Sequence, residues 1–146
     1  MIKTETEYRE SKKRLEIEFQ TVEQHRSKMK AAGMSSKQIY LAIDPLATFA
    51  LQFQEEVEEY ERIMRGQFDV IENLSGIGHQ LVAMRIFRGM KQKELAEKIG
   101  IKESQVSRDE RNEYHGASIE KIQKVLTALG VKLKSKVEAP MRMKTS

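Results

Sequence analysis

The chain contains no cysteine among its 146 residues, and none of its apolar runs approaches the roughly 20 residues that span a bilayer. The lack of cysteine excludes disulfide bonds and cysteine-based zinc sites. It fits the reducing cytoplasm, where we expect this protein to act. The sequence begins with Glu5, Glu7 and Glu10 and no apolar segment. We therefore expect no signal peptide and no membrane partner.

Groups that perform enzyme chemistry are sparse as well. His25, His79 and His115 are scattered, and none has a partner at the His-Glu-x-x-His spacing of a metal site. A phosphate-binding loop of the GxxxxGK type is also absent. The sequence therefore predicts a protein that is not an enzyme and needs no metal or cofactor.

Charge is divided unevenly between the two halves of the chain. Residues 1–75 hold 11 Lys or Arg and 14 Asp or Glu, a net charge of −3. Residues 76–146 hold 15 and 8, a net charge of +7. A basic C-terminal half suits a phosphate backbone, whereas an acidic N-terminal half is better suited to protein contacts.

Apolar residues recur every seven positions in residues 4–32, which predicts a long amphipathic helix that ends at Gly33. Ser35 or Ser36 is expected to cap a short helical turn after it. The residues of this apolar stripe are Tyr8, Leu15, Val22 and Met29, with Phe19 beside them.

A second long helix is predicted to begin at Asp44 and Pro45, because Asp is a good N-cap and Pro fits the first helical position. Its apolar positions again follow a seven-residue repeat, and it ends at Gly66. The resulting hairpin either buries both stripes within one chain or leaves apolar surface for a second copy or another protein, and we favour the latter. The predicted dimer or partner interface consists of Leu46, Phe49, Phe53, Val57, Tyr60 and Met64.

Two segments break the helical period. Residues 67–74 and residues 131–137 alternate side chains at period two, which is typical of strands. Because lone strands are rare, we predict that the two pair as a short antiparallel β ribbon, within one chain or across a dimer.

Residues 92–112 have the pattern of two short helices joined by a tight turn. Leu95, Ala96 and Ile99 share one apolar face. Gly100 supplies the positive φ that ends the first helix, and Val106 anchors the second. The second helix presents short polar and basic side chains outward, as a helix-turn-helix must do to read a major groove.

The predicted fold is therefore mostly α. It comprises a helical hairpin (residues 1–66), a short strand and linker (67–78), a four-helix helix-turn-helix domain that ends in the second strand (79–137), and a flexible tail (138–146).

The helix pair resembles the XRE type of helix-turn-helix, the type of Cro and lambda repressor, over about residues 80–133. The resemblance implies a dimer that places one recognition helix in each of two major grooves. It also implies an internal salt bridge between Arg85 and Glu94. The matching residues are Arg85, Gly89, Gln92, Glu94, Leu95, Ala96, Gly100, Val106, Ser107, Arg108 and Glu110.

The order of the longer segments is similar, more loosely, to a group of bacterial and phage regulators. An acidic first helix with Tyr8, an acidic heptad helix ending at Gly66, and the sequence Tyr-His-Gly-Ala-Ser at residues 114–118 carry this likeness. Some proteins of this kind are HigA-type antitoxins.

Base reading requires donors and acceptors on the recognition-helix face opposite Val106. Arg108 can bond bidentately to guanine and Gln105 to adenine. For any single lysine, a solvated position is as good an interpretation as a contact. The predicted base contacts are Lys102, Glu103, Ser104, Gln105 and Arg108, and the predicted phosphate contacts are Lys91, Gln92, Lys93 and Arg111.

Two departures from the resemblance are visible. Asp109 stands where an apolar residue is usual, so either the recognition helix ends early or rotates, or Asp109 pairs with Arg108 or Arg111. Lys91 and Lys102 stand where Ser or Thr N-caps are common, which we interpret as lysines that face DNA.

These observations predict a sequence-specific regulator of transcription that binds double-stranded DNA as a homodimer and represses by blocking a promoter. One rival is an antitoxin whose N-terminal half neutralises a protein toxin while the C-terminal domain autoregulates its operon. A second rival is an assembly protein whose helix-turn-helix has lost DNA binding.

Overall fold

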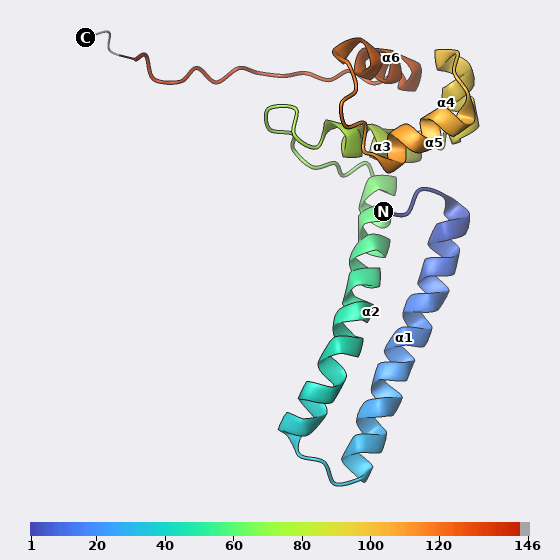
Figure 1. Cartoon of the computed structure of the whole chain (residues 1–146), viewed down its shortest axis with the longest axis vertical. Helices are drawn as coiled ribbons and strands as arrows, with labels where there is room; N and C mark the ends of the chain where they lie inside the picture. The colour runs from blue at the N-terminus through green and yellow to red at the C-terminus, as the bar shows by residue number, and fades with distance from the viewer. Residues whose placement is uncertain (144–146) are drawn as a thin grey trace.

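The computed structural model describes residues 1–143, and these residues form six helices in two parts (Figure 1). A long antiparallel hairpin of α1 (Glu5–Ala31) and α2 (Ser36–Met64) carries a cluster of four shorter helices at one end. These are α3 (Ile77–Phe87), α4 (Gln92–Ile99), α5 (Glu103–Arg111) and α6 (Ile119–Leu129). No helix among the described residues is long and apolar enough to cross a membrane.

The first helix follows its predicted bounds, but the second begins earlier than predicted. Ser35 accepts a hydrogen bond from the N–H of Gln38 (3.3 Å), and the Gln38 side chain accepts one from the N–H of Ser35 (2.9 Å). This reciprocal capping starts α2 directly after the turn. Ile43 and Ala50 are both buried, so the apolar seam continues through Pro45, which lies inside the helix. The seam thus outweighs the one backbone hydrogen bond that Pro45 removes.

The predicted β ribbon is wrong, because residues 1–143 contain no strand. Val70 is 90% exposed, and Asn73 and Leu74 adopt positive φ, so residues 67–74 form an irregular loop. Residues 131–143 extend beyond α6 without regular secondary structure (Figure 1). Of the predicted tail, residues 138–143 are exposed. Residues 144–146 lie outside the described part of the chain.

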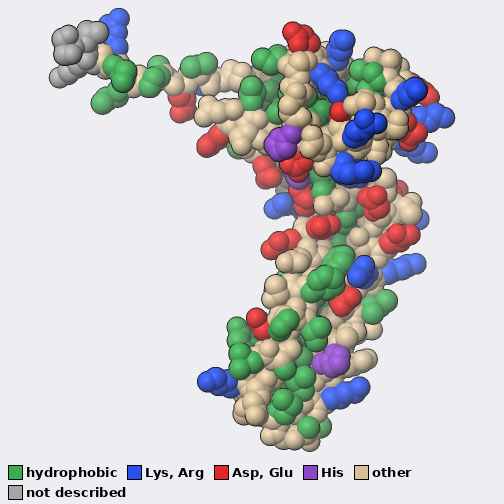
Figure 2. Space-filling view, viewed as in Figure 1, with side chains coloured by type: hydrophobic (Ala, Val, Ile, Leu, Met, Phe, Trp, Pro, Cys, Tyr) green, Lys and Arg blue, Asp and Glu red, His purple; other side chains and the backbone are tan. Residues whose placement is uncertain are grey.

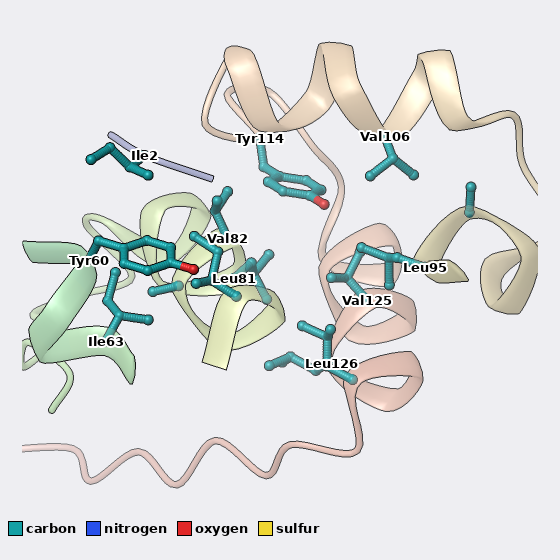
Figure 3. Close-up of a cluster of buried hydrophobic side chains, with 14 of the residues drawn as sticks. Ile2, Tyr60, Ile63, Leu81, Val82, Leu95, Val106, Tyr114, Val125 and Leu126 are labelled. Atoms are coloured by element: carbon teal, nitrogen blue, oxygen red, sulfur yellow. The ribbon is translucent and has the colours of Figure 1, made fainter. Parts of the chain in front are cut away.

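One hydrophobic core joins the hairpin to the four-helix domain (Figure 3). Ile2, Tyr60 and Ile63 come from the hairpin side, and each is at most 7% exposed. They meet Leu81 and Val82 of α3, which are 1% exposed. The N-terminus of the chain is therefore fixed beside the helix-turn-helix rather than left in solvent.

Candidate nucleic-acid interface

The α4–α5 pair is held as a unit by a turn at Gly100. Gly100 has φ +80°, which glycine adopts without strain, and its N–H donates to the carbonyl of Ala96 (2.9 Å). Leu95, Ala96 and Val106 are at most 2% exposed and pack the two helices together. This confirms the helix-turn-helix predicted over residues 92–112.

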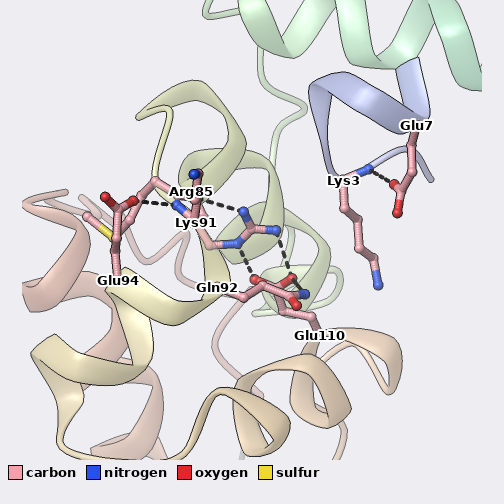
Figure 4. A network of polar contacts seen from close by, with 8 residues as sticks. Lys3, Glu7, Arg85, Lys91, Gln92, Glu94 and Glu110 are labelled. Carbon is pink, nitrogen blue, oxygen red and sulfur yellow. Dashed lines mark hydrogen bonds and ion pairs between the residues drawn. The ribbon is translucent and has the colours of Figure 1, made fainter. Parts of the chain in front are cut away.

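A buried ion pair locks α5 onto α3. Arg85 and Glu110 are 2% and 1% exposed, and Arg85 donates from Nε (2.5 Å) and a terminal nitrogen (2.9 Å) to the two carboxylate oxygens. Arg85 also donates to the carbonyl of Met90 (2.7 Å), and Gln92 donates to Glu110 (2.7 Å), as Figure 4 shows. Bidentate geometry fixes both the tilt and the depth of α5.

The predicted partner of Arg85 was therefore wrong. Glu94 instead accepts from the backbone N–H of Lys91 (2.7 Å) and stabilises the start of α4 (Figure 4). Glu110 lies four residues after buried Val106 and so on the same helical face. That spacing could have identified Glu110 as the inward carboxylate.

Most of the predicted base contacts lie on the exposed face of α5 and at its start. Lys102, Glu103, Ser104 and Arg108 are all exposed. Gln105 is half-buried, and its amide donates to Asp109 (3.0 Å). The first four side chains are free to meet base edges, whereas Gln105 must give up an internal bond to do so.

Asp109 has a partner that the sequence did not suggest. Its carboxylate lies 2.6 Å from the ammonium of Lys121 on α6 and accepts from Gln105, so it pairs with neither Arg108 nor Arg111. The helix does not end at this position, because α5 continues to Arg111. A carboxylate at this usually apolar position thus ties α5 to α6 and leaves Arg108 outward.

The predicted phosphate contacts lie at the start of α4 and the end of α5. Lys91, Lys93 and Arg111 are exposed, whereas Gln92 is half-buried and engaged with Glu110. Lys91 and Lys102 are the N-cap residues of α4 and α5, and neither side chain caps its helix. Their ammonium groups are therefore available to an anion.

A cleft of about 740 Å³ adjoins this surface. One wall contains Gln92, Ser107 and Arg111 of the helix-turn-helix, and the other contains Lys3 and the first turn of α1. The sequence did not predict that the N-terminus of the chain lies near the helix-turn-helix. The heptad pattern of α1 does not specify where the residues before its first turn lie.

The hairpin residues assigned to a dimer or partner interface fall into two groups. Val57 and Tyr60 are 4% and 7% exposed and are covered by the same chain, with Tyr60 stacked on Tyr8 (ring centroids 4.7 Å apart). Phe53 is half-buried. The members that remain exposed are Leu46 (39%), Phe49 (43%) and Met64 (48%).

Side-chain chemistry differs between the two ends of the molecule (Figure 2). Lys and Arg gather over the four-helix domain, Asp and Glu lie along the upper part of α2, and apolar side chains gather over the lower part of the hairpin.

Among the described residues, no group of three or more His, Cys, Asp or Glu is arranged to hold a metal ion.

Comparison with models of known families gives a match in the C-terminal half of the chain. Residues 82–135 match a family model described as helix-turn-helix. A search of curated proteins and a search of solved structures each give no significant match. The family match supports a DNA-binding regulator of transcription, and its family is one of regulatory domains rather than of enzymes.

Proposed function

We propose that this protein, whose residues 82–135 match a helix-turn-helix domain, is a sequence-specific repressor that reads the major groove of double-stranded DNA with α5. The observation that carries the proposal is the division of α5 into two faces. Val106 and Glu110 point into the core, at 1% exposure each, while Ser104 and Arg108 lie exposed. The inward face is rigid, so the outward face is pre-organised for base edges.

Arg108 is the strongest candidate for a specific base contact. Guanidinium groups bond bidentately to the O6 and N7 of guanine, the commonest specific contact in the major groove. Asp109 is engaged by Lys121, so no ion pair within residues 1–143 holds Arg108 away from DNA. Lys102, Glu103 and Ser104 complete the reading surface, and Lys91, Lys93 and Arg111 contact phosphates on either side.

The repressor acts as a homodimer in this proposal, with its two recognition helices about 34 Å apart on one side of the duplex. The exposed apolar residues of the hairpin support this, because two helices alone leave them in water. Residues 38–54 contain a single charged side chain, Asp44. Depletion of charge together with exposed aromatic residues is typical of the core of an interface.

An antitoxin role is the second candidate. The observation that favours it is the acidic upper part of α2, where five glutamates lie between residues 55 and 61. Such a surface suits a basic protein partner. Purification with a basic protein bound at a fixed ratio to this chain, lost when Glu55 and Glu58 are changed to Gln, would support this role over that of a simple repressor.

Arg108→Ala tests the base-reading assignment. We expect it to weaken binding to the preferred duplex by about 1–3 kcal/mol and to relax the preference at one base position of each half-site. Competition against single-base variants of that duplex measures both effects. Lys93→Ala is the matched control, because a phosphate contact weakens binding to all sequences alike. An unchanged base preference in Arg108→Ala would remove Arg108 from the reading surface.

A further inference from the structure

We propose that the N-terminus of the chain is part of the DNA site, and that Lys3 contacts a phosphate of the DNA backbone. This inference rests on the proposed function, because it concerns the same surface. It adds a contact from outside the helix-turn-helix, on a segment that the sequence assigned to the hairpin.

The cleft of about 740 Å³ places Lys3 opposite the phosphate-binding edge of the helix-turn-helix. Gln92, Ser107 and Arg111 line the facing wall, and Lys91 and Glu103 line the same cleft. Gln92, Lys91 and Arg111 are among the predicted phosphate contacts. A DNA backbone that reaches these residues therefore runs along the mouth of this cleft, within reach of the wall that contains Lys3.

Lys3 is directed toward this space. It lines the cleft, and Figure 4 shows its side chain extending away from Glu7 and the first turn of α1. Within residues 1–143, no ion pair joins Lys3, Lys91 or Arg111 to a carboxylate. Three cationic groups from three segments thus face one cleft, with their charges available to an anion.

The acidic residues on the N-terminal wall are occupied locally. Glu7 accepts a hydrogen bond from the backbone N–H of Lys3 (2.8 Å), and Glu5 pairs with Arg9 one turn later. The remaining carboxylate of the cleft is Glu103, at the start of α5, where it faces the predicted base-reading surface. The ion pair with Arg9 lowers the repulsion between Glu5 and a phosphate, and the hydrogen bond from Lys3 holds the Glu7 carboxylate against the backbone.

Lys3 is also held in place before any DNA arrives. The preceding residue, Ile2, is 4% exposed and lies in the core with Tyr60 and Ile63. The terminal ammonium of Met1 lies 3.4 Å from Glu56, and the following residue, Thr4, caps α1. Because the backbone around Lys3 is already ordered, a phosphate contact costs only the freedom of one side chain.

The test is the salt dependence of DNA binding by full-length Lys3→Gln. Each phosphate neutralised by a cation contributes about 0.9 to the slope of log affinity against log salt concentration. We expect Lys3→Gln to lower that slope by about 0.9, which weakens binding about eightfold at roughly 0.1 M salt. The probes are a duplex recovered by selection and a duplex of mixed sequence, because a phosphate contact affects both.

Two variants serve as controls. Lys13→Gln removes the same charge from an exposed position of α1 outside the cleft and should leave the slope at the wild-type value. Lys3→Arg should also keep the wild-type slope, because the cation remains. Equal slopes for Lys3→Gln and Lys13→Gln, with the wild type still selecting a specific duplex, would overturn this inference alone. Absence of sequence-selective binding by the wild type would overturn the proposed function instead.

Discussion

The two halves of this molecule bury their apolar residues to very different extents. The largest side chains below 2% exposure are Leu81, Val82, Leu95, Val106, Glu110, Val125 and Leu129, and all belong to the four-helix domain. The hairpin instead leaves large apolar residues in water, among them Ile17, Tyr40, Leu41, Phe49 and Leu51, which are 43–66% exposed. The four-helix domain has a complete hydrophobic core, whereas the hairpin leaves an apolar surface uncovered.

The difference separates two ways in which such a protein can use its surface. In our proposal the four-helix domain holds α5 rigidly, because base contacts require fixed side chains. The hairpin needs only to present a surface, and its apolar residues support our proposal that a second copy covers them. The ion pairs differ in the same direction, because Arg85–Glu110 in the domain is buried whereas Glu5–Arg9 in the hairpin is exposed.

The largest effect that sharpens this comparison is expected at Glu110. Glu110→Gln leaves Arg85 charged and buried without its carboxylate, which typically costs about 3–5 kcal/mol. We expect a corresponding fall in the free energy of unfolding, measured by urea denaturation. Glu5→Gln, which breaks the exposed pair with Arg9, should cost less than about 1 kcal/mol.

A double variant separates the contribution of the two charges from that of side-chain packing. Arg85→Met with Glu110→Leu fills the same space without charge and should recover most of the lost stability. Equal small losses for Glu110→Gln and Glu5→Gln would show that the two halves do not differ as described.

A smaller effect is expected in the hairpin. Phe49→Glu places a charge in the exposed apolar set, and burying a Phe side chain is worth about 1.5–3 kcal/mol. We expect the dissociation constant of the dimer to rise by at least about tenfold, measured by sedimentation at several concentrations. Gln52→Glu adds the same charge to an exposed polar site of α2 as a control. A dimer of unchanged strength in Phe49→Glu would place the interface elsewhere.

The smallest effect concerns Tyr114, which is 6% exposed. Burial raises the pKa of its phenol well above the usual range, and the carboxylates of Glu110 and Asp109 raise it further. The unfolded chain loses this proton near pH 10 while the folded chain keeps it, so stability present below pH 10 declines above it.

We therefore expect the contribution of Tyr114 to the free energy of unfolding to be about 1.4 kcal/mol smaller at pH ~11 than below pH ~9. Tyr114→Phe should lose less stability than the wild type between pH ~8 and pH ~11, as measured by denaturant unfolding at both values. The same loss in both proteins would mean that Tyr114 ionises freely in the folded state.

The sequence predicted those features that depend on local spacing. The heptad repeat identified α1 and most of α2, and the positions of Gly100 and Val106 identified the helix-turn-helix. The family match over residues 82–135 agrees with the latter. Local spacing also separated the exposed Ser104 and Arg108 from the buried Val106.

Features that depend on contacts between distant residues could not be predicted in this way. Lys121 reaches Asp109 only because α6 packs against α3 and α4, which brings its first turn near α5. Lys3 reaches the cleft only because Ile2 enters a core formed by other helices. The β ribbon failed for the same reason, since alternation at residues 131–137 says nothing about whether a second strand lies alongside.

The most direct test of DNA recognition by α5 is selection of the full-length protein against a random duplex library at about 150 mM salt, with competitor DNA present. We predict recovery of an inverted repeat whose half-site centres are about 10 base pairs, one helical turn, or a multiple of that apart. Recovery of no preferred sequence, with only weak binding that salt abolishes, would contradict this account and leave the hairpin as the functional surface.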